Sequence, residues 1–235
     1  MLPFYGYYNL MYFVFGLPAL LFGLYAQYKV QSSFRKYSQV ANSWRMTGVD
    51  AARRLLAASS LGHVNVEGTP GNLTDHYDPR SKTLRLSQGV AHSNSVAALG
   101  IVAHEVGHAV QDATAYAPLR LRAGLVPVLT FGSYLGPILF MVGLVFQSFN
   151  LALIGVLFFA AAAVFALITL PVERDASRRA LAMLESSGLV ASTGERGAVK
   201  SVLSAASLTY VAAVAQAVST LLYYVFLLGG MRRRD

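Results

Sequence analysis

The sequence predicts a mainly α-helical membrane protein, with about four transmembrane helices and a small α+β segment that contains a short β-hairpin or sheet. The first observation is composition: 55% of the 235 residues are hydrophobic and only 13% are charged, which is unlike an ordinary soluble protein. The second is that long apolar stretches alternate with polar ones. The third is a strand-like pattern between residues 63 and 87.

Four stretches are long and apolar enough to cross a bilayer, which takes about 20 helical residues. They are residues 7–26, 124–146, 151–171 and a segment within 203–230. Because only residues 147–150 separate the second stretch from the third, we expect an antiparallel helical hairpin. Gly132 and Gly136 in the second stretch, and the small residues 160–163 in the third, would allow the helices to approach closely. The chain after residue 171 then returns to the side of Arg120 and Arg122.

Charge favours a cytoplasmic location for the polar segments. Residues 28–123 carry 11 Lys and Arg, and residues 172–202 carry five more. Cytoplasmic loops of membrane proteins are enriched in positive charge, so both segments are expected on that side. The first apolar stretch lacks a preceding basic region and so reads as a retained anchor. The basic residues 232–234 at the C-terminus oppose this orientation. We expect five parts: a membrane anchor (1–27), two cytoplasmic segments (28–123 and 172–202), a transmembrane hairpin (124–171), and a last span with a basic tail (203–235).

Composition also excludes some classes of site. The chain has no Cys, so it has neither a disulfide framework nor a Cys-ligated metal site. The net charge of +8 does not predict nucleic-acid binding, because most basic residues flank apolar segments, where they set topology or meet lipid. The lipid bilayer is the expected partner.

The polar segment before residue 124 predicts two helices and a small sheet. Apolar residues recur at helical spacing over 43–60. Residues 63–66 alternate, a Gly-Thr-Pro-Gly turn follows, and NLTDHYD and TLRLS then flank an Asp-Pro-Arg turn, which is typical of a hairpin. Ser93 or Ser95 can cap the next helix, which would end near Ala113.

That second helix contains the run IVAHEVGHAVQ, residues 101–111. His104 and His108 are four residues apart and project from one helical face, so both can reach a single ion. Glu105 lies at the edge of that face, where it can take a proton from a water molecule beside the ion. The alternative is an amphipathic helix that merely contains these polar residues.

A catalytic zinc site needs a third protein ligand. The metzincin continuation is excluded, because Gln111 and Thr114 stand where Gly and His would be. The candidates that remain are three upstream histidines and Glu173, which the predicted hairpin returns to the same side of the membrane. Spacing alone does not decide between two roles for Glu173: a metal ligand, or an acid that complements the positive end of a new helix. The upstream candidates are His63, His76 and His92.

Four runs carry a resemblance: LTDHYDP, LRLS, AHEVGHAVQ and LPVERDASRRAL. Together they resemble the YugP-like family of bacterial membrane zinc metallopeptidases, itself similar to HtpX-type membrane proteases. The resemblance implies a zincin-like segment in which His104, His108 and Glu173 bind one Zn²⁺ in the gluzincin manner, with Glu105 as catalytic base. HtpX-type proteins commonly carry Asp four residues after the ligand Glu. Here that position is Ser177.

The nearby acid is instead Asp175, two residues after Glu173 and so on another side of the helix. This makes Asp175 a doubtful partner for a ligand histidine, and a surface or capping role is the alternative.

The resemblance implies a multi-pass zinc endopeptidase of the bacterial inner membrane that acts on protein or peptide substrates from the cytoplasmic side. The substrate could add as a strand to residues 83–87, or these residues could form an internal strand that binds no ligand. Four residues are candidates for the hydrogen-bond donor that stabilises the oxyanion, and the sequence does not choose among them. Two rivals remain: a site-2-type intramembrane metalloprotease, and a non-catalytic zinc-binding membrane protein, against which the retention of Glu105 argues. The four oxyanion candidates are His92, Tyr116, Arg178 and Tyr210.

Overall fold

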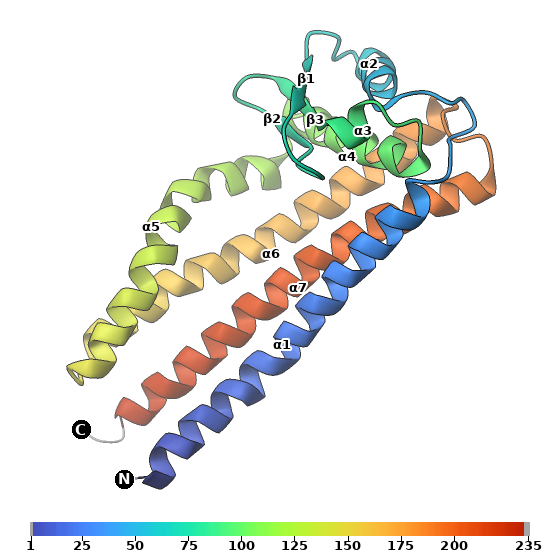
Figure 1. The fold of residues 1–235 in the computed structure, drawn as a ribbon. Coiled ribbons are helices and arrows are strands. Elements are labelled where there is room, and N and C mark those ends of the chain that lie inside the picture. Colours follow the sequence, from blue (N-terminus) through green and yellow to red (C-terminus); the bar gives the residue numbers. More distant parts are fainter. Residues whose placement is uncertain (1, 233–235) are drawn as a thin grey trace. The chain divides into compact units, whose positions relative to one another are not determined.

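A computed structural model describes residues 2–232, with side chains from residue 10 onward except 127, 128, 130, 133 and 232. The chain divides into two compact units, each described here by itself (Figure 1). Unit 1 comprises Met1–Ala26, Leu121–Leu170 and Thr209–Asp235, and unit 2 comprises Gln27–Arg120 and Pro171–Leu208. Arg233 and Arg234 of the predicted basic tail lie outside the described residues.

The structure confirms a mainly helical protein with membrane-spanning character. Its long helices are α1 (Leu2–Tyr37), α5 (Ala117–Val145), α6 (Phe149–Ser186) and α7 (Thr193–Arg232). Three helical segments of the described chain are long and apolar enough to span a bilayer: Leu10–Tyr37, Phe149–Ser186 and Thr193–Met231. In α5 the apolar stretch found among the described residues is the shorter Tyr134–Val145.

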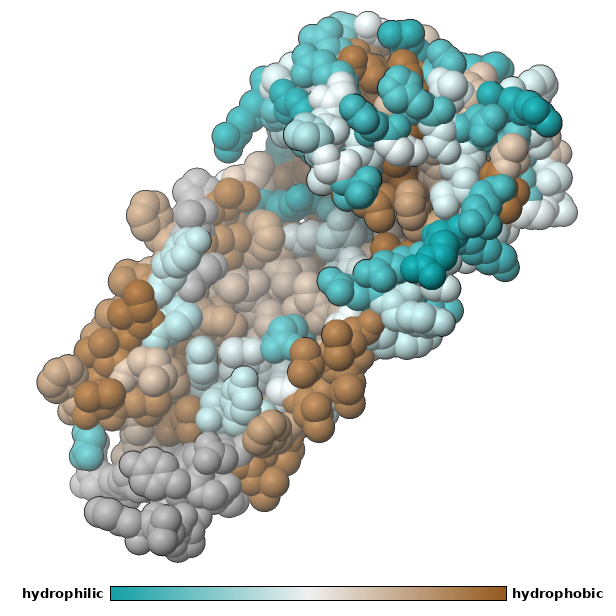
Figure 2. Space-filling model, viewed as in Figure 1, coloured by the Kyte–Doolittle hydropathy of each residue, from teal (hydrophilic) through white to brown (hydrophobic). Residues whose placement is uncertain are grey.

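Exposed hydrophobic side chains are concentrated on unit 1. Among the large hydrophobic residues described as exposed, only Tyr28, Val40, Trp44 and Leu73 belong to unit 2. Figure 2 shows hydrophobic side chains over the visible face of the unit 1 helices and hydrophilic ones gathered over unit 2. Apolar side chains facing outward from helices are stable in lipid, not in water, so the surface of unit 1 suits a bilayer.

The α5–α6 hairpin packs backbone against backbone through small residues. A Cβ atom on Gly143 would stand 2.3 Å from the Ala152 nitrogen, and one on Gly155 would stand 2.4 Å from the Phe140 nitrogen. Gly136 also meets α6 at the Gly155 carbonyl, at 3.2 Å by the same measure. The predicted close approach is therefore confirmed, although its tightest points lie nearer the turn than Gly132 and Gly136.

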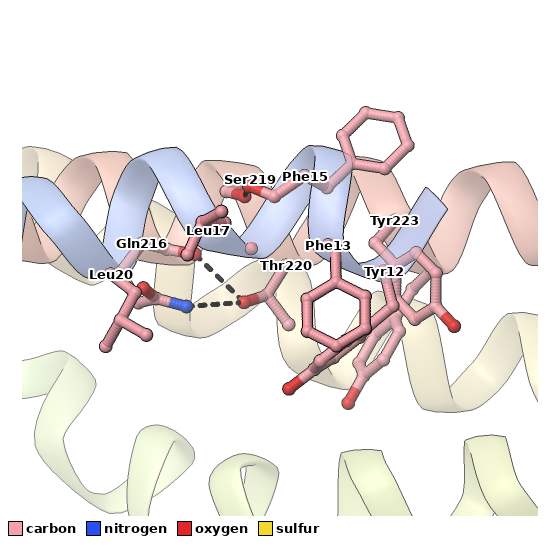
Figure 3. A pocket seen from close by; sticks show the side chains of 11 residues that line it. Tyr12, Phe13, Phe15, Leu17, Leu20, Gln216, Ser219, Thr220 and Tyr223 are labelled. Carbon is pink, nitrogen blue, oxygen red and sulfur yellow. Dashed lines mark hydrogen bonds between the residues drawn. The ribbon is translucent and has the colours of Figure 1, made fainter. Parts of the chain in front are cut away.

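A groove of about 400 Å³ lies between α1 and α7 within unit 1 (Figure 3). Its polar side chains are paired: Ser219 of α7 donates to the Phe15 carbonyl of α1, and Gln216 donates to Thr220 Oγ1 one turn along α7 at 3.3 Å. Hydroxyl and amide groups are costly in lipid unless they are paired. These bonds let α7 carry polar residues inside an apolar span.

Unit 2 contains α2 (Gly48–Ala58), α3 (Gln88–Ala91), α4 (Val96–Ala113) and a three-stranded sheet. The predicted hairpin is confirmed, because β2 (His76–Asp78) pairs antiparallel with β3 (Thr83–Ser87). The first strand, β1 (Asn65–Thr69), pairs parallel with β3, so β3 is central. Since both edges of β3 are paired, the idea that residues 83–87 accept a substrate strand is wrong. The edge strands of the sheet are β1 and β2.

The helix α6 continues through Pro171 to Ser186, so the prediction of a new helix starting at Glu173 is wrong. Proline removes one main-chain donor and usually kinks or ends a helix, yet here the last apolar turn and the Glu173 turn belong to one element. Glu173 therefore does not complement the positive end of a helix. This removes the main alternative to a role as ligand.

Candidate metal centre

The two histidines lie on α4, a helix whose first turn is fixed by Ser95. The Ser95 hydroxyl accepts a hydrogen bond from the Ala98 N–H at 3.1 Å, which confirms the predicted N-cap. Apolar residues of α4 fill the core of unit 2. The imidazole rings of His104 and His108, one turn apart, have centroids 4.8 Å apart. Both rings point to one side, as their spacing predicts.

Glu173 on α6 meets both histidines at the same carboxylate oxygen. Its Oε2 atom lies 3.2 Å from His104 Nε2 and 3.3 Å from His108 Nε2. Glu173 is 2% exposed. Among the described residues these three form a group whose candidate ligand atoms all lie within 4.8 Å of one another. The structure thus brings together the three predicted ligands.

The spacing suits zinc. Zn²⁺ binds imidazole nitrogen and carboxylate oxygen at about 2.0–2.1 Å in a tetrahedron, so neighbouring ligand atoms stand about 3.3 Å apart. The two distances from Glu173 Oε2 match that value, although they are also compatible with hydrogen bonds. A buried set of two imidazoles and one carboxylate is the donor set of a catalytic rather than a structural zinc site. The residues present therefore fit the metal.

Two hydrogen bonds reach the ring nitrogens on the far side from Glu173. The Ser177 hydroxyl lies 3.2 Å from His104 Nδ1, and Gln111 Oε1 lies 3.0 Å from His108 Nδ1. Such outer partners orient ligand histidines. The sequence did not reveal the part played by Gln111, because its contacts depend on the packing of α4 against α6.

Asp175 contributes indirectly. Its Oδ2 accepts a hydrogen bond from Gln111 Nε2 at 3.0 Å. Arg178 and Arg179 both pair with its carboxylate. Asp175 therefore contacts the residue that contacts His108, which makes it more than a surface or capping acid.

Glu105 is buried beside the ligand pair. Its Oε2 accepts a hydrogen bond from the Tyr77 N–H of β2 at 3.0 Å. Burial raises the pKa of Glu105, and the nearby imidazoles of His108 and His104 oppose that rise. The carboxylate is thus placed between the edge strand β2 and the histidines.

Tyr77 joins β2 to α4 at a second point. Its hydroxyl donates to Asp112 Oδ2 at 2.8 Å, and Lys82 Nζ lies 2.5 Å from the same oxygen. Glu105 and Asp112 are two helical turns apart, so one residue of β2 contacts α4 over that length. Burial of the phenol raises the pKa of Tyr77, and the hydrogen bond to Asp112 adds to that rise.

The other candidates lie outside the ligand group. His63, His76 and His92 are exposed, and His76 Nδ1 lies 2.8 Å from the Thr74 carbonyl oxygen. Of the oxyanion candidates besides His92, Arg178 pairs with Asp175, the Tyr116 ring lies under the Arg179 guanidinium, and Tyr210 belongs to unit 1. The upstream histidines are therefore not ligands in this arrangement.

Comparison with known proteins agrees with the geometry. Residues 12–229 match a family described as "putative neutral zinc metallopeptidase". The chain is also 44% identical over 218 residues to "Putative membrane protease YugP" of Bacillus subtilis (strain 168), covering 92% of this chain and 96% of that protein. No solved structure matches. The chain belongs to this zinc metallopeptidase family, and the predicted YugP-like resemblance is confirmed.

Proposed function

We propose that this protein is a membrane-embedded, zinc-dependent endopeptidase of the gluzincin type, with a zincin-like catalytic segment in unit 2. The observation that carries the proposal is the convergence of His104, His108 and Glu173 on one point, with Glu105 buried beside them. These three ligands would hold one zinc ion per chain. When bound, zinc supplies Lewis acidity, which polarises a scissile carbonyl and makes water a better nucleophile.

The protein's own groups divide the remaining work. Glu105 removes a proton from the attacking water and delivers it to the leaving nitrogen. The Tyr77 N–H holds one oxygen of Glu105, which leaves the other free for the proton. Because that N–H is directed at Glu105 of α4, β2 holds the base in place beside the histidines.

Two rivals are less well supported. A site-2-type protease carries its motif inside a spanning helix, but α4 is absent from the candidate spans found in the described chain. A non-catalytic zinc protein has no need of a carboxylate such as Glu105, buried next to the ligands without being one of them. We therefore favour the peptidase.

We further propose that unit 2 faces the cytoplasm in a bacterial plasma membrane and that α5 is a fourth span. Support comes from the excess of Lys and Arg in the polar segments and from the short 147–150 connection of the hairpin. Reporter fusions at residues 147–150 test this. A cytoplasmic signal there would reverse the proposed orientation.

The catalytic proposal is tested with Glu105→Gln in purified, zinc-loaded protein. We expect unchanged zinc content and a loss of cleavage of a model membrane protein by at least about 100-fold, the usual scale of general-base catalysis. The matched control is Glu67→Gln, which alters an exposed acid of β1. Unchanged turnover in Glu105→Gln would exclude Glu105 as the base.

A further inference from the structure

The side chain of Gln111 has no place in the reaction above, yet it is fully buried, at 0% exposure. It stands three residues after His108 on α4, between that histidine and α6. A buried amide is retained only where its polar atoms are satisfied. Its three contacts show what it does.

The hydrogen-bond network fixes the orientation of this amide. The Nε2 atom donates to the Val172 carbonyl at 2.8 Å and to Asp175 Oδ2 at 3.0 Å. A side-chain amide nitrogen has two N–H groups, and both are used. Exchanging oxygen and nitrogen would set the amide oxygen against two acceptors, so the orientation cannot be reversed.

The consequence falls on His108. With both N–H groups directed at α6, Oε1 faces His108 Nδ1 at 3.0 Å and can only accept. The imidazole must therefore carry a proton on Nδ1. The lone pair of Nε2, 3.3 Å from Glu173 Oε2, is then free to bind a metal.

Asp175 supplies the fixed end of this chain of contacts. It is 5% exposed and is paired with Arg178 and Arg179. The two guanidinium groups hold this carboxylate in place, so that Oδ2 stands as the acceptor for the Gln111 amide. His104 differs, because its partner is the Ser177 hydroxyl, which can donate or accept. Of the two ligand histidines, only His108 has its tautomer imposed.

We propose that Gln111 is a positioning residue that holds His108 in the Nδ1–H tautomer and thereby sets Nε2 for metal binding, with Asp175 anchoring the amide. The inference rests on the metal site proposed above, but it concerns the resting protein and is measured without catalysis.

The first test is ¹⁵N nuclear magnetic resonance of histidine-labelled, metal-free protein, at a pH where the ring is neutral. The spectrum of His108, assigned by its loss in His108→Ala, is expected to show protonated Nδ1 and unprotonated Nε2. A neutral ring protonated on Nε2 would overturn the proposal. This readout does not depend on the folding of a Gln111 variant.

The second test is zinc affinity, measured by competition with a chelator in Gln111→Leu. We expect a 10- to 100-fold weaker affinity, the usual effect of losing an outer partner, and a mixed tautomer at His108. The matched control, Gln88→Leu at an exposed position of α3, should bind zinc as the wild type does.

Asp175→Asn provides a variant that keeps an acceptor oxygen for the amide. It should retain the His108 tautomer. Its zinc affinity should stay within about threefold of wild type, where a tenfold change in affinity corresponds to about 1.4 kcal/mol. Wild-type affinity and tautomer in Gln111→Leu would refute the positioning role while leaving the peptidase proposal intact. If the wild-type protein bound no zinc, the peptidase proposal would be refuted instead. The tautomer measurement would still decide the role of Gln111.

Discussion

Gly107 of α4 lies directly against the main chain of Ala176 in α6. A Cβ atom built on Gly107 would stand 2.6 Å from the Ala176 carbonyl oxygen. Gly107 is flanked by the ligand turns of α4, and Ala176 lies one turn beyond Glu173. The closeness of these two helices therefore determines whether one carboxylate oxygen can meet both imidazoles.

We expect Gly107→Ala to push α6 away from α4. Overpacking of this kind costs about 1–3 kcal/mol of unfolding free energy, and zinc affinity should fall with it because Glu173 moves with α6. Chemical denaturation and chelator competition measure the two effects. The control is Gly100→Ala on the same helix, where the new Cβ meets Val199 Cγ1 at an ordinary 3.4 Å. Equal zinc affinity in the two variants would show that this contact does not set the site.

Tyr77→Phe removes the hydroxyl that bonds Asp112 and leaves the N–H that bonds Glu105. We expect a loss of about 1–2 kcal/mol in unfolding free energy, since the bond reaches a charged acceptor. Zinc content should not change, because Tyr77 contacts no ligand, whereas turnover should fall as β2 loosens beside Glu105. Lys82→Met removes the other, exposed partner of Asp112 and should cost little. An equal loss of unfolding free energy in both variants would show that the stabilisation depends on Asp112 and not on the Tyr77 hydroxyl in particular.

Asp78 links acid stability to the β2–β3 turn. Its carboxylate accepts from the Ser81 hydroxyl, Arg85 and the Arg80 N–H, which hold the pKa of Asp78 below its usual range. Because the folded-state pKa is the lower one, the stabilisation is fully present above the unfolded-state pKa, near 4, and is lost progressively as the pH falls from there toward the folded-state pKa. In metal-free protein, Asp78→Asn should therefore lose less stability than wild type between about pH 5 and pH 3. Parallel denaturation curves over this range would contradict the prediction.

The transmembrane hairpin offers a test in unit 1. Gly155→Ala should lower the thermal stability of detergent-solubilised protein, by about 1–3 kcal/mol in free energy, because its Cβ would collide with the Phe140 main chain. Gly124→Ala on α5 meets nothing within 4 Å and should be neutral. Equal stability of the two variants would argue against close packing of α5 on α6.

What the sequence predicted well depends on local geometry. Four-residue spacing on a helix places His104 and His108 together wherever that helix lies, and Ser95 caps it from three residues away. Three of the four predicted membrane segments and the β2–β3 hairpin follow from equally local patterns. Glu173 required more: the returning hairpin brought it to the right side, and only the family resemblance identified it as a ligand.

What the sequence did not predict depends on how elements meet. Pro171 suggested a helix boundary, but α6 continues through it. The parallel pairing of β1 with β3 carries no local signal, so the sequence left open whether β3 is an edge strand or an internal one. The bonds of Gln111 and Ser177 exist because α4 and α6 cross at Gly107, and no spacing along the chain encodes that crossing.

The most direct test of the metal centre is the zinc content of three purified proteins: wild type, Glu173→Ala, and Glu185→Ala as a control for an exposed acid of the same helix. With two imidazoles and one carboxylate as ligands, we predict about one zinc per chain in the wild type and in Glu185→Ala, and almost none in Glu173→Ala. A full zinc content in Glu173→Ala would contradict the account.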